Sequence, residues 1–306
     1  MTAIKIRMAG YGPPTTGFSK SLTFIGDRLS AQFGNDVAID YVFNVMDHGY
    51  KAEDILTLVE NGEMTLGYQS SSYLTDRVPE LGFVDLPFLF QSNAQARAAM
   101  DGALGDYLAR KTEERISYRI LGWFENGFRH ISNRLRPIHR PADMKGMRIR
   151  VLPSEIHRRT FELIGATPLR MDLTEAIIMI KAGTLDAQEN PLANTVTYGV
   201  HKFHKFHTLT SHFYISRPIF LHRPTYESWP KELRRAMQAA VTDAVAFQRR
   251  LAEEEHVESR KIIEATGCVI NALTNAEHDA FVAAVQPLLK DARAMYGDEM
   301  FALVPN

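Results

Sequence analysis

The segment AGTLDAQENPLAN (182–194) places three polar side chains, Gln188, Glu189 and Asn190, after a short apolar run, and a proline follows them. Amide and carboxylate groups at a strand end are typical of ligand sites, because α/β proteins bind ligands outside the carboxyl ends of their strands. Glu189 could act as a general acid or base, whereas Asn190 could only donate and accept hydrogen bonds. The segment therefore predicts a site for either catalysis or ligand capture.

Two arginines, Arg129 in ENGFRHISN and Arg150 in MRIRV, belong to the same part of the chain as Asn190. We expect both at strand ends, where their side chains would reach the same ligand. A guanidinium binds a carboxylate through two parallel charge-assisted hydrogen bonds. The three residues therefore predict a carboxylate-binding site, although a solvated or salt-bridged arginine is the common state of such a side chain.

A second polar run, Gln69-Ser70-Ser71-Ser72, follows a predicted strand in the first half of the chain. Ligand contact and a plain polar loop are equally good interpretations of this run. Closer to the N-terminus, the turn Gly10-Tyr11-Gly12-Pro13-Pro14 begins like a dinucleotide-binding fingerprint. It then carries two prolines, which lack the N–H groups that a phosphate needs, and it has no third glycine. We therefore expect no nucleotide cofactor.

Histidines gather in HKFHKFHTLTSHFY, at positions 201, 204, 207 and 212. The spacing of the first two could hold a metal on a helix, but carboxylate ligands are absent nearby. A helix end that runs into a strand, with histidines at its surface, is the simpler interpretation, and we expect no metal. The sequence also lacks a Walker A loop, a G-x-S-x-G elbow and an H-E-x-x-H motif.

Composition narrows the class of protein. The 306 residues are 45% hydrophobic, and this length suits two domains. With 35 basic and 36 acidic residues the net charge is −1, which argues against a nucleic-acid partner. The single cysteine, Cys268, rules out an intramolecular disulfide. We find neither an apolar stretch of about 18 residues nor an apolar signal region in MTAIKIRMAG, so the chain is either cytosolic or a mature form without its leader.

Two parts of the chain share one order of elements: strand, helix, strand, helix, glycine, strand and polar cluster. The first part has expected strands at 4–8, 37–42 and 64–68, expected helices at 19–33 and 50–60, and Gly62. The second part has expected strands at 147–151, 168–171 and 185–187, expected helices at 155–164 and 173–182, and Gly183. Each βαβαβ unit predicts an α/β lobe with a mostly parallel sheet, and the polar strand ends of the two lobes could face each other across a cleft.

A long helix is expected near the C-terminus, where Pro230 suits a first-turn position. Its apolar stripe has helical spacing and consists of Leu233, Met237, Ala240, Ala244, Phe247 and Leu251. The pattern runs to about Ala265, and some 35 residues would reach about 50 Å, so we expect this helix to lie across both lobes. Thr274 and Glu277 have the spacing of a capping box for a last helix.

Four stretches carry a resemblance to a known family: FVDLPFLF (83–90), ADMKGMRIRVLPS (142–154), LIGATPLRMDLTEAIIMIKAGTLDAQENP (163–191) and the segment around LTSH (209–212). The chain resembles the substrate-binding proteins of tripartite ATP-independent periplasmic (TRAP) transporters, of the dicarboxylate-binding type. The resemblance implies a two-lobed α/β periplasmic binding protein, class II-like, with mixed, mostly parallel sheets and a long helix that spans both lobes. It also implies that Arg150 binds the substrate carboxylate and that Arg129 and Asn190 assist.

In this family-based prediction, lobe 1 comprises 1–124 and 211–250, lobe 2 comprises 125–210 and 251–306, and crossing strands and a helix at about 229–265 join them. The implied partners are a small organic acid and TRAP membrane subunits. The chain would act as a monomer in the periplasm, with its leader removed.

The leading hypothesis is a non-catalytic receptor for a sugar acid, a hydroxy acid or an aromatic carboxylate. Selectivity would come from lobe 1, through Gln69, Ser70, Tyr11 and Tyr68. His212 and Phe213, on the return crossing, are weaker candidates. Two alternatives stay open: a bilobal enzyme that uses Glu189 as acid or base, and a cytosolic ligand sensor on the same fold.

Overall fold

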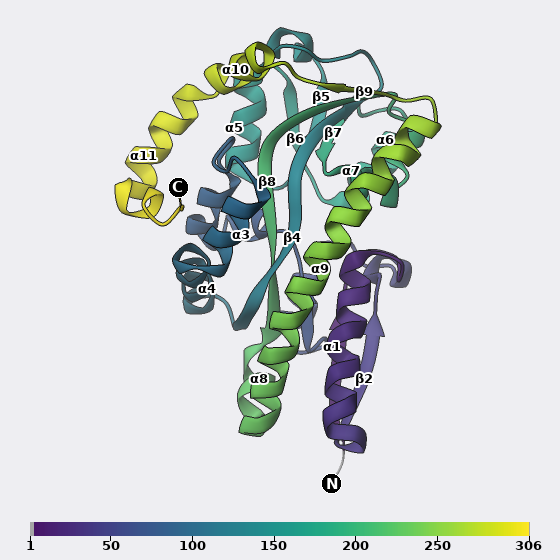
Figure 1. Ribbon diagram of the computed structural model, residues 1–306, viewed down its shortest axis with the longest axis vertical. Helices are drawn as coiled ribbons and strands as arrows, with labels where there is room; N and C mark the ends of the chain where they lie inside the picture. The colour runs from purple at the N-terminus through teal and green to yellow at the C-terminus, as the bar shows by residue number, and fades with distance from the viewer. Residues whose placement is uncertain (1–2, 306) are drawn as a thin grey trace.

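The computed structural model describes residues 3–305 of the chain, which form a mixed α/β structure (Figure 1). The strands are β1 (Ile4–Ala9), β2 (Val37–Val42), β3 (Leu66–Tyr68), β4 (Tyr118–Asn133), β5 (Arg148–Val151), β6 (Thr167–Arg170), β7 (Ala187–Asn190), β8 (Phe206–His222) and β9 (Val269–Ala272). The α-helices are α1 (Gly17–Phe33), α2 (Asp54–Glu60), α3 (Asn93–Asp101), α4 (Ala103–Arg115), α5 (Glu155–Ile164), α6 (Leu173–Lys181), α7 (Leu192–Thr197), α8 (Arg223–Ser228), α9 (Lys231–Ala265), α10 (Asn275–Ala284) and α11 (Gln286–Phe301). Short 3₁₀ helices are η1 (Gly34–Asp36), η2 (Val45–His48), η3 (Ser71–Leu74), η4 (Pro79–Asp85), η5 (Pro141–Met144) and η6 (Val200–Lys202).

The strands follow one continuous path in the order β2-β1-β3-β8-β4-β7-β5-β6, and β9 pairs with β8. Each end of this path is parallel, since β1 pairs in parallel with β2 and β3, and β5 with β6 and β7. Between the two ends, β4 and β8 form a long antiparallel pair that runs through the molecule (Figure 1). The predicted two-lobed α/β architecture with crossing strands is therefore confirmed, and the two parallel groups of strands are parts of one sheet.

Helix α9 runs along the outside of the crossing strands and reaches past both groups of parallel strands (Figure 1). Leu233, Met237, Ala240 and Ala244 of the predicted stripe are buried, as expected. Helix α1 packs beside α9, and Thr16 caps α1 by accepting a hydrogen bond from Ser19 N (3.2 Å). The capping box of Thr274 and Glu277 at α10 is also confirmed.

The pairing of β4 with β8 is interrupted by a bulge between Glu125 and Gly127, where Gly127 has a φ of +85°. At this bulge, the side chain of Gln248 of α9 forms hydrogen bonds with the backbone N–H and C=O groups of Glu125. Its Oε1 accepts from Glu125 N and its Nε2 donates to Glu125 O, both at 2.9 Å. Together with Gln238, whose Nε2 donates to Leu121 O of β4 (2.8 Å), this side chain fastens α9 to the crossing strands.

The C-terminal helix α11 packs beside α5 and against η4, where the Phe301 ring lies 4.9 Å from the ring of Phe83. Leu288 and Met300 of α11 join the hydrophobic core built around β1, α1 and α9. A separate core surrounds β5 and includes Phe161. Where the boundary between the lobes runs stays a prediction.

Two local predictions were wrong. The strand expected at 185–187 begins at Ala187 and ends at Asn190, so the polar triplet is itself a buried strand. It is one because its backbone pairs with β4 on one side and with β5 on the other. Arg129 was expected at a strand end but lies inside the 16-residue strand β4. No helix among residues 3–305 has both the length and the apolar character that crossing a membrane requires.

Candidate ligand-binding site

A small cavity lies where β4, β5, β7 and β8 meet the loops that follow β1 and β3. Its lining consists of Tyr11, Gln69, Ser70, Tyr73, Asn126, Arg129, Arg150, Leu152, Leu173, Asn190, Asn194, Tyr198 and Arg217. Six of these residues were predicted from the sequence: Tyr11, Gln69, Ser70, Arg129, Arg150 and Asn190. The free volume is about 20 Å³, room for about one water molecule. An organic acid can therefore enter only if the lining moves apart.

Arg150 is buried, with 1% of its surface exposed, and its hydrogen bonds go to neutral partners. Its Nε donates to Met171 O (3.2 Å) and its Nη2 to the Tyr73 hydroxyl (3.0 Å). Among residues 3–305, no acidic oxygen lies within 4.0 Å of its guanidinium. Because a buried charge is costly unless it is paired, this arginine is arranged to receive an anion.

Arg129, in contrast, already has a buried counter-ion in Glu189. Its Nε donates to Glu189 Oε2, and its Nη2 donates to Glu189 Oε1 (2.9 Å) and to the backbone oxygen of the same residue (2.6 Å). Burial alone would raise the pKa of Glu189, but the charge and the hydrogen bonds of Arg129, together with the nearby His212 ring, outweigh it and hold that pKa well below its usual range. A carboxylate held ionised in this way is a poor acid or base, which disfavours the catalytic role considered for Glu189.

Asn190 lies beside these arginines and is itself held by a chain of side chains. Its Nδ2 donates to Gln188 Oε1 (2.6 Å), and Gln188 Nε2 donates in turn to the hydroxyls of Ser132 and Thr195 (both 3.2 Å). Gln188 therefore braces Asn190 and does not line the cavity. Because the brace fixes its rotamer, the Asn190 amide is pre-organised for a ligand.

The polar run of the first lobe forms a hydrogen-bonded turn at the cavity wall. Gln69 Oε1 accepts from Ser70 N (2.8 Å), and Gln69 Nε2 donates to Ala52 O (2.7 Å). The Ser72 hydroxyl donates to the buried Asp85 at 2.7 Å. The run is in part a polar loop, since its own side chains hydrogen-bond within it, and in part a candidate for ligand contact, since Gln69 and Ser70 line the cavity.

The remaining predicted residues lie outside the cavity. His212 sits behind the ion pair, with its Nε2 3.6 Å from Glu189 Oε2, and Phe213 stacks on the ring of His157 at 4.0 Å. The ring of Tyr68 packs at 5.2 Å from that of Phe18 and lines an adjoining hollow. The structure therefore places these three side chains as supports of the cavity walls.

Arg217 of β8 is the main cavity residue that the sequence did not reveal. It is 3% exposed, and its Nη2 donates to Asn126 Oδ1 at 2.8 Å. Its guanidinium lies over the ring of Phe18 at 4.0 Å and over that of Tyr11 at 4.9 Å. The only signal in the sequence was a charge inside the apolar run YISRPIF, which is common at bends and edges of strands.

Three tyrosines, Tyr11, Tyr73 and Tyr198, line the cavity together with the arginines. Burial raises the pKa of each phenol, although nearby arginines oppose the rise. All three therefore stay neutral near pH 7 and act as hydrogen-bond donors and acceptors.

The histidines expected at the surface are buried, because side chains of neighbouring segments cover them, and their exposed fractions lie between 1% and 7%. His204 Nδ1 lies 3.0 Å from the Ser132 hydroxyl, and His207 Nε2 lies 3.0 Å from His204 O. Within residues 3–305, no group of three or more His, Cys, Asp or Glu side chains is placed to hold a metal ion.

These histidines predict a loss of stability in mild acid. Burial lowers the pKa of His130 and His204 to about 3 and that of His207 to about 4. The unfolded chain takes up protons below about pH 6.5 while the folded chain does not, so the free energy of unfolding falls as the pH falls. We expect a decrease of about 2 kcal/mol for each such histidine between pH 8 and pH 5, measured by urea unfolding.

The control for this prediction is a histidine of the same chain that is exposed to solvent. His130→Asn should flatten the dependence of the unfolding free energy on pH, whereas the same change at the exposed His48 should leave it as in wild type. Equal unfolding free energies at pH 8 and pH 5 in the wild-type chain would contradict the prediction.

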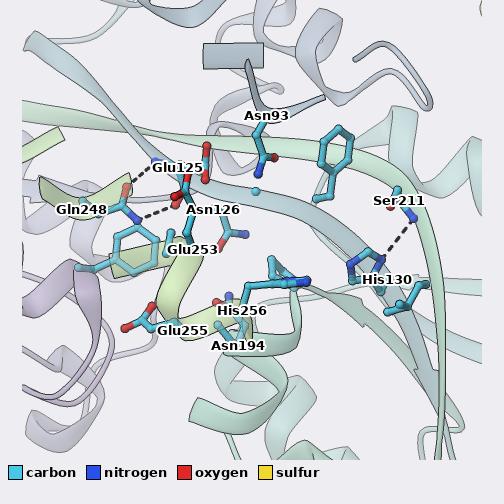
Figure 2. A pocket seen from close by; sticks show the side chains of 17 residues that line it. Asn93, Glu125, Asn126, His130, Asn194, Ser211, Gln248, Glu253, Glu255 and His256 are labelled. Atoms are coloured by element: carbon cyan, nitrogen blue, oxygen red, sulfur yellow. Dashed lines mark hydrogen bonds between the residues drawn. The ribbon is translucent and has the colours of Figure 1, made fainter. Parts of the chain in front are cut away.

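A second hollow, of about 360 Å³, lies between β4, α7 and α9 and shares Asn126 and Asn194 with the cavity (Figure 2). Its acidic side chains already have partners. Arg97 binds Glu125 through two hydrogen bonds (2.7 and 2.8 Å) and Glu253 through one (2.8 Å). The third acidic side chain, Glu255, accepts a hydrogen bond from Gly17 N, so the hollow offers volume next to the cavity but no free carboxylate among the described side chains that line it.

Comparison with known proteins gives the following relatives. The model of the bacterial extracellular solute-binding proteins, family 7, matches residues 42–295. A solute-binding protein of Verminephrobacter eiseniae is 29% identical over 239 residues, which are 78% of this chain and 70% of that protein. The 2,3-diketo-L-gulonate-binding periplasmic protein of Escherichia coli is 27% identical over 241 residues, 78% of this chain and 72% of that protein.

Two solved structures have the same fold. A TRAP periplasmic solute-binding protein of Polaromonas, bound to D-erythronate, superposes with a TM-score of 0.92 at 24% identity, over 98% of both chains. One of Sulfitobacter, with bound β-D-galacturonate, superposes with a TM-score of 0.90 at 25% identity, again over 98% of both chains.

Proposed function

The chain belongs to the bacterial extracellular solute-binding proteins of family 7, and we propose that it captures an organic acid in the cavity between its lobes and delivers it to a TRAP-type membrane transporter. Members of this family are receptors for solutes and not enzymes. We further propose that the chain works as a monomer in the periplasm. The single observation that carries the proposal is Arg150, a buried guanidinium that faces the cavity without a carboxylate partner.

In this proposal the carboxylate of the ligand pairs with Arg150. Asn190, which is braced by Gln188, would donate a further hydrogen bond, and Arg129 would add its positive field while it stays paired with Glu189. Charge-assisted hydrogen bonds in a cavity that excludes water are stronger than exposed ones. The pairing of Glu189 does not support the enzyme alternative, because both oxygens of that carboxylate already accept hydrogen bonds from Arg129.

The neutral polar groups of the cavity suit a hydroxylated acid. Tyr11 and Tyr198 offer phenol groups, whereas the Tyr73 hydroxyl already bonds Asp172, Arg150 and Leu173. An aromatic acid would give the phenols of Tyr11 and Tyr198 no hydroxyl to bond, which is costly for buried groups. The relatives also support a sugar acid, because the Escherichia coli protein is named for 2,3-diketo-L-gulonate and the Sulfitobacter protein holds β-D-galacturonate.

A thermal-shift screen tests the proposal. We expect at least one hydroxylated organic acid to raise the unfolding temperature, because a ligand that binds the folded state stabilises it by mass action. Galactitol, which has the hydroxyls of galactonate but no carboxylate, is the matched negative control. Mass spectrometry should recover the acid unchanged after incubation. If no carboxylate in the library shifts the unfolding temperature, or if the acid is converted, the proposal is wrong.

A further inference from the structure

Arg217 is a second buried guanidinium of the cavity that lacks an acidic partner. In the antiparallel pair of β4 and β8, Arg217 of β8 lies opposite Phe124 of β4, and Phe213 of β8 lies opposite Arg129 of β4. Four residues along β8 separate these two positions, about 13 Å at the rise of a strand. Arg217 therefore reaches the cavity from a backbone position well separated from that of Arg129.

The contacts of Arg217 are all with neutral groups. One hydrogen bond goes to Asn126 Oδ1 (2.8 Å), and aromatic rings cover its faces: Phe18 at 4.0 Å, Tyr11 at 4.9 Å and Tyr68 at 5.8 Å. Its Nε is buried and has no hydrogen-bond partner among residues 3–305. Aromatic faces stabilise a cation, but they do not neutralise its charge.

The nearest candidate for a counter-ion is Glu255, which lines the adjoining hollow together with Arg217. Its carboxylate is already used, since Oε1 accepts a hydrogen bond from Gly17 N at 2.5 Å, at the start of α1. No oxygen of Glu255 lies within 4.0 Å of the Arg217 guanidinium. Glu255 therefore belongs to the helix terminus and leaves the cation without a partner.

The charges of the cavity do not balance. Three arginines and no acidic residue line it, and Glu189 compensates only Arg129. Arg150 and Arg217 remain as two buried cations, at 1% and 3% exposure. They share one space, because both line the same cavity together with Tyr198. Burying two like charges without anions is costly, and one ligand can relieve both.

We propose that the ligand is a dianion, with one carboxylate on Arg150 and the second on Arg217. Arg217 is then the residue that determines specificity, because it distinguishes an acid with carboxylates at both ends from one that ends in a hydroxyl. The rings of Phe18 and Tyr11 keep water from the guanidinium, which strengthens its pairing with the second carboxylate. This inference rests on the proposed function, since it names the class of acid that the same cavity takes.

Two matched pairs of acids test the inference by calorimetry. Galactarate and galactonate differ only in the sixth carbon, which is a carboxylate in one and an alcohol in the other, and succinate and 4-hydroxybutyrate differ in the same way over four carbons. We expect wild-type protein to bind the dicarboxylate of at least one pair about 10-fold or more tightly than its partner, as for a desolvated charge pair. Arg217→Met should remove that preference and change the affinity for the monocarboxylate by less than about threefold.

Controls separate a specific effect from a loss of fold. Arg217→Lys keeps the charge and should retain part of the preference, while Arg119→Met, on the neighbouring strand and outside the cavity, should keep all of it. Thermal unfolding identifies any variant that does not fold. If Arg217→Met does not fold, the affinities of the wild-type protein for the two acids of each pair decide whether the ligand is a dianion. The inference is overturned if the tightest ligand in the acid library is a monocarboxylate, or if Arg217→Met weakens both members of a pair equally. If no carboxylate binds at all, it is the proposed function that has failed.

Discussion

Arg150→Ala should lose binding of every carboxylate that the wild-type chain binds, by about 2–5 kcal/mol of binding free energy, or about 30-fold and more in affinity. The reason is that a ligand carboxylate would then be buried without its cation. Calorimetry with the acid that gives the largest thermal shift measures the loss. The fold should survive, because the Tyr73 hydroxyl, one of the two partners of Arg150, keeps its hydrogen bonds to Asp172 and Leu173.

Arg148→Ala is the matched control for this loss. It removes the same charge from the same strand, two residues earlier, but the Arg148 side chain is 46% exposed and pairs with Asp186 away from the cavity. Asp186 would keep its bond to Arg134 at 2.8 Å. Wild-type affinity in Arg150→Ala would remove Arg150 from the site and, with it, the observation that carries the proposed function.

Glu189→Gln should destabilise the folded chain by about 3–5 kcal/mol, measured by urea unfolding at neutral pH. Arg129 and Glu189 are 1% and 0% exposed, and the variant would leave the guanidinium buried without a counter-ion. His212 and His157 also lie within 4.0 Å of this carboxylate. Burial lowers the pKa of His212 and so disfavours its charged form. The ion pair of Glu189 is therefore the one with Arg129.

Glu155→Gln is the control, since it also breaks an arginine pair but on the surface, where the Glu155 side chain is 50% exposed. It should cost less than about 1 kcal/mol. The double variant Arg129→Met with Glu189→Leu should recover most of the stability lost in Glu189→Gln, because apolar side chains of similar size need no partner. A Glu189→Gln protein within 1 kcal/mol of wild type would show that the ion pair contributes little.

Much of the fold could be predicted because its signals are local. The strand at Val37–Val42 and the helix at Glu155–Ile164 have the expected bounds, since periodicity and turn residues within each segment determine them. Arg150 and Asn190 could be found for a related reason. Both are polar residues in or next to short segments that the sequence indicates as strands, and the parallel order of β5 and β7 brings their side chains to one edge of the sheet.

What could not be predicted depends on contacts between distant segments. The environment of Arg217 is made by Phe18, Tyr11 and Asn126, which are more than 90 residues away in the sequence. The pairing of Glu189 with Arg129 joins residues 60 positions apart. The histidines looked like surface residues because lysines alternate with them in the segment, but contacts with distant residues, such as that of Ser132 with His204, bury them. No local pattern carries this information.

Gln248 stands at the midpoint of α9, with seventeen residues on either side of it. The two hydrogen bonds of Gln248 hold the helix at its centre, with two equal arms of about 25 Å, and Gln238 on the N-terminal arm also donates to Leu121 O of β4 (2.8 Å). A tilt of about 10° about Gln248 would displace each end by about 4 Å, in opposite directions. A rotation of one group of parallel strands against the other therefore has to tilt α9, bend it or break these hydrogen bonds to β4.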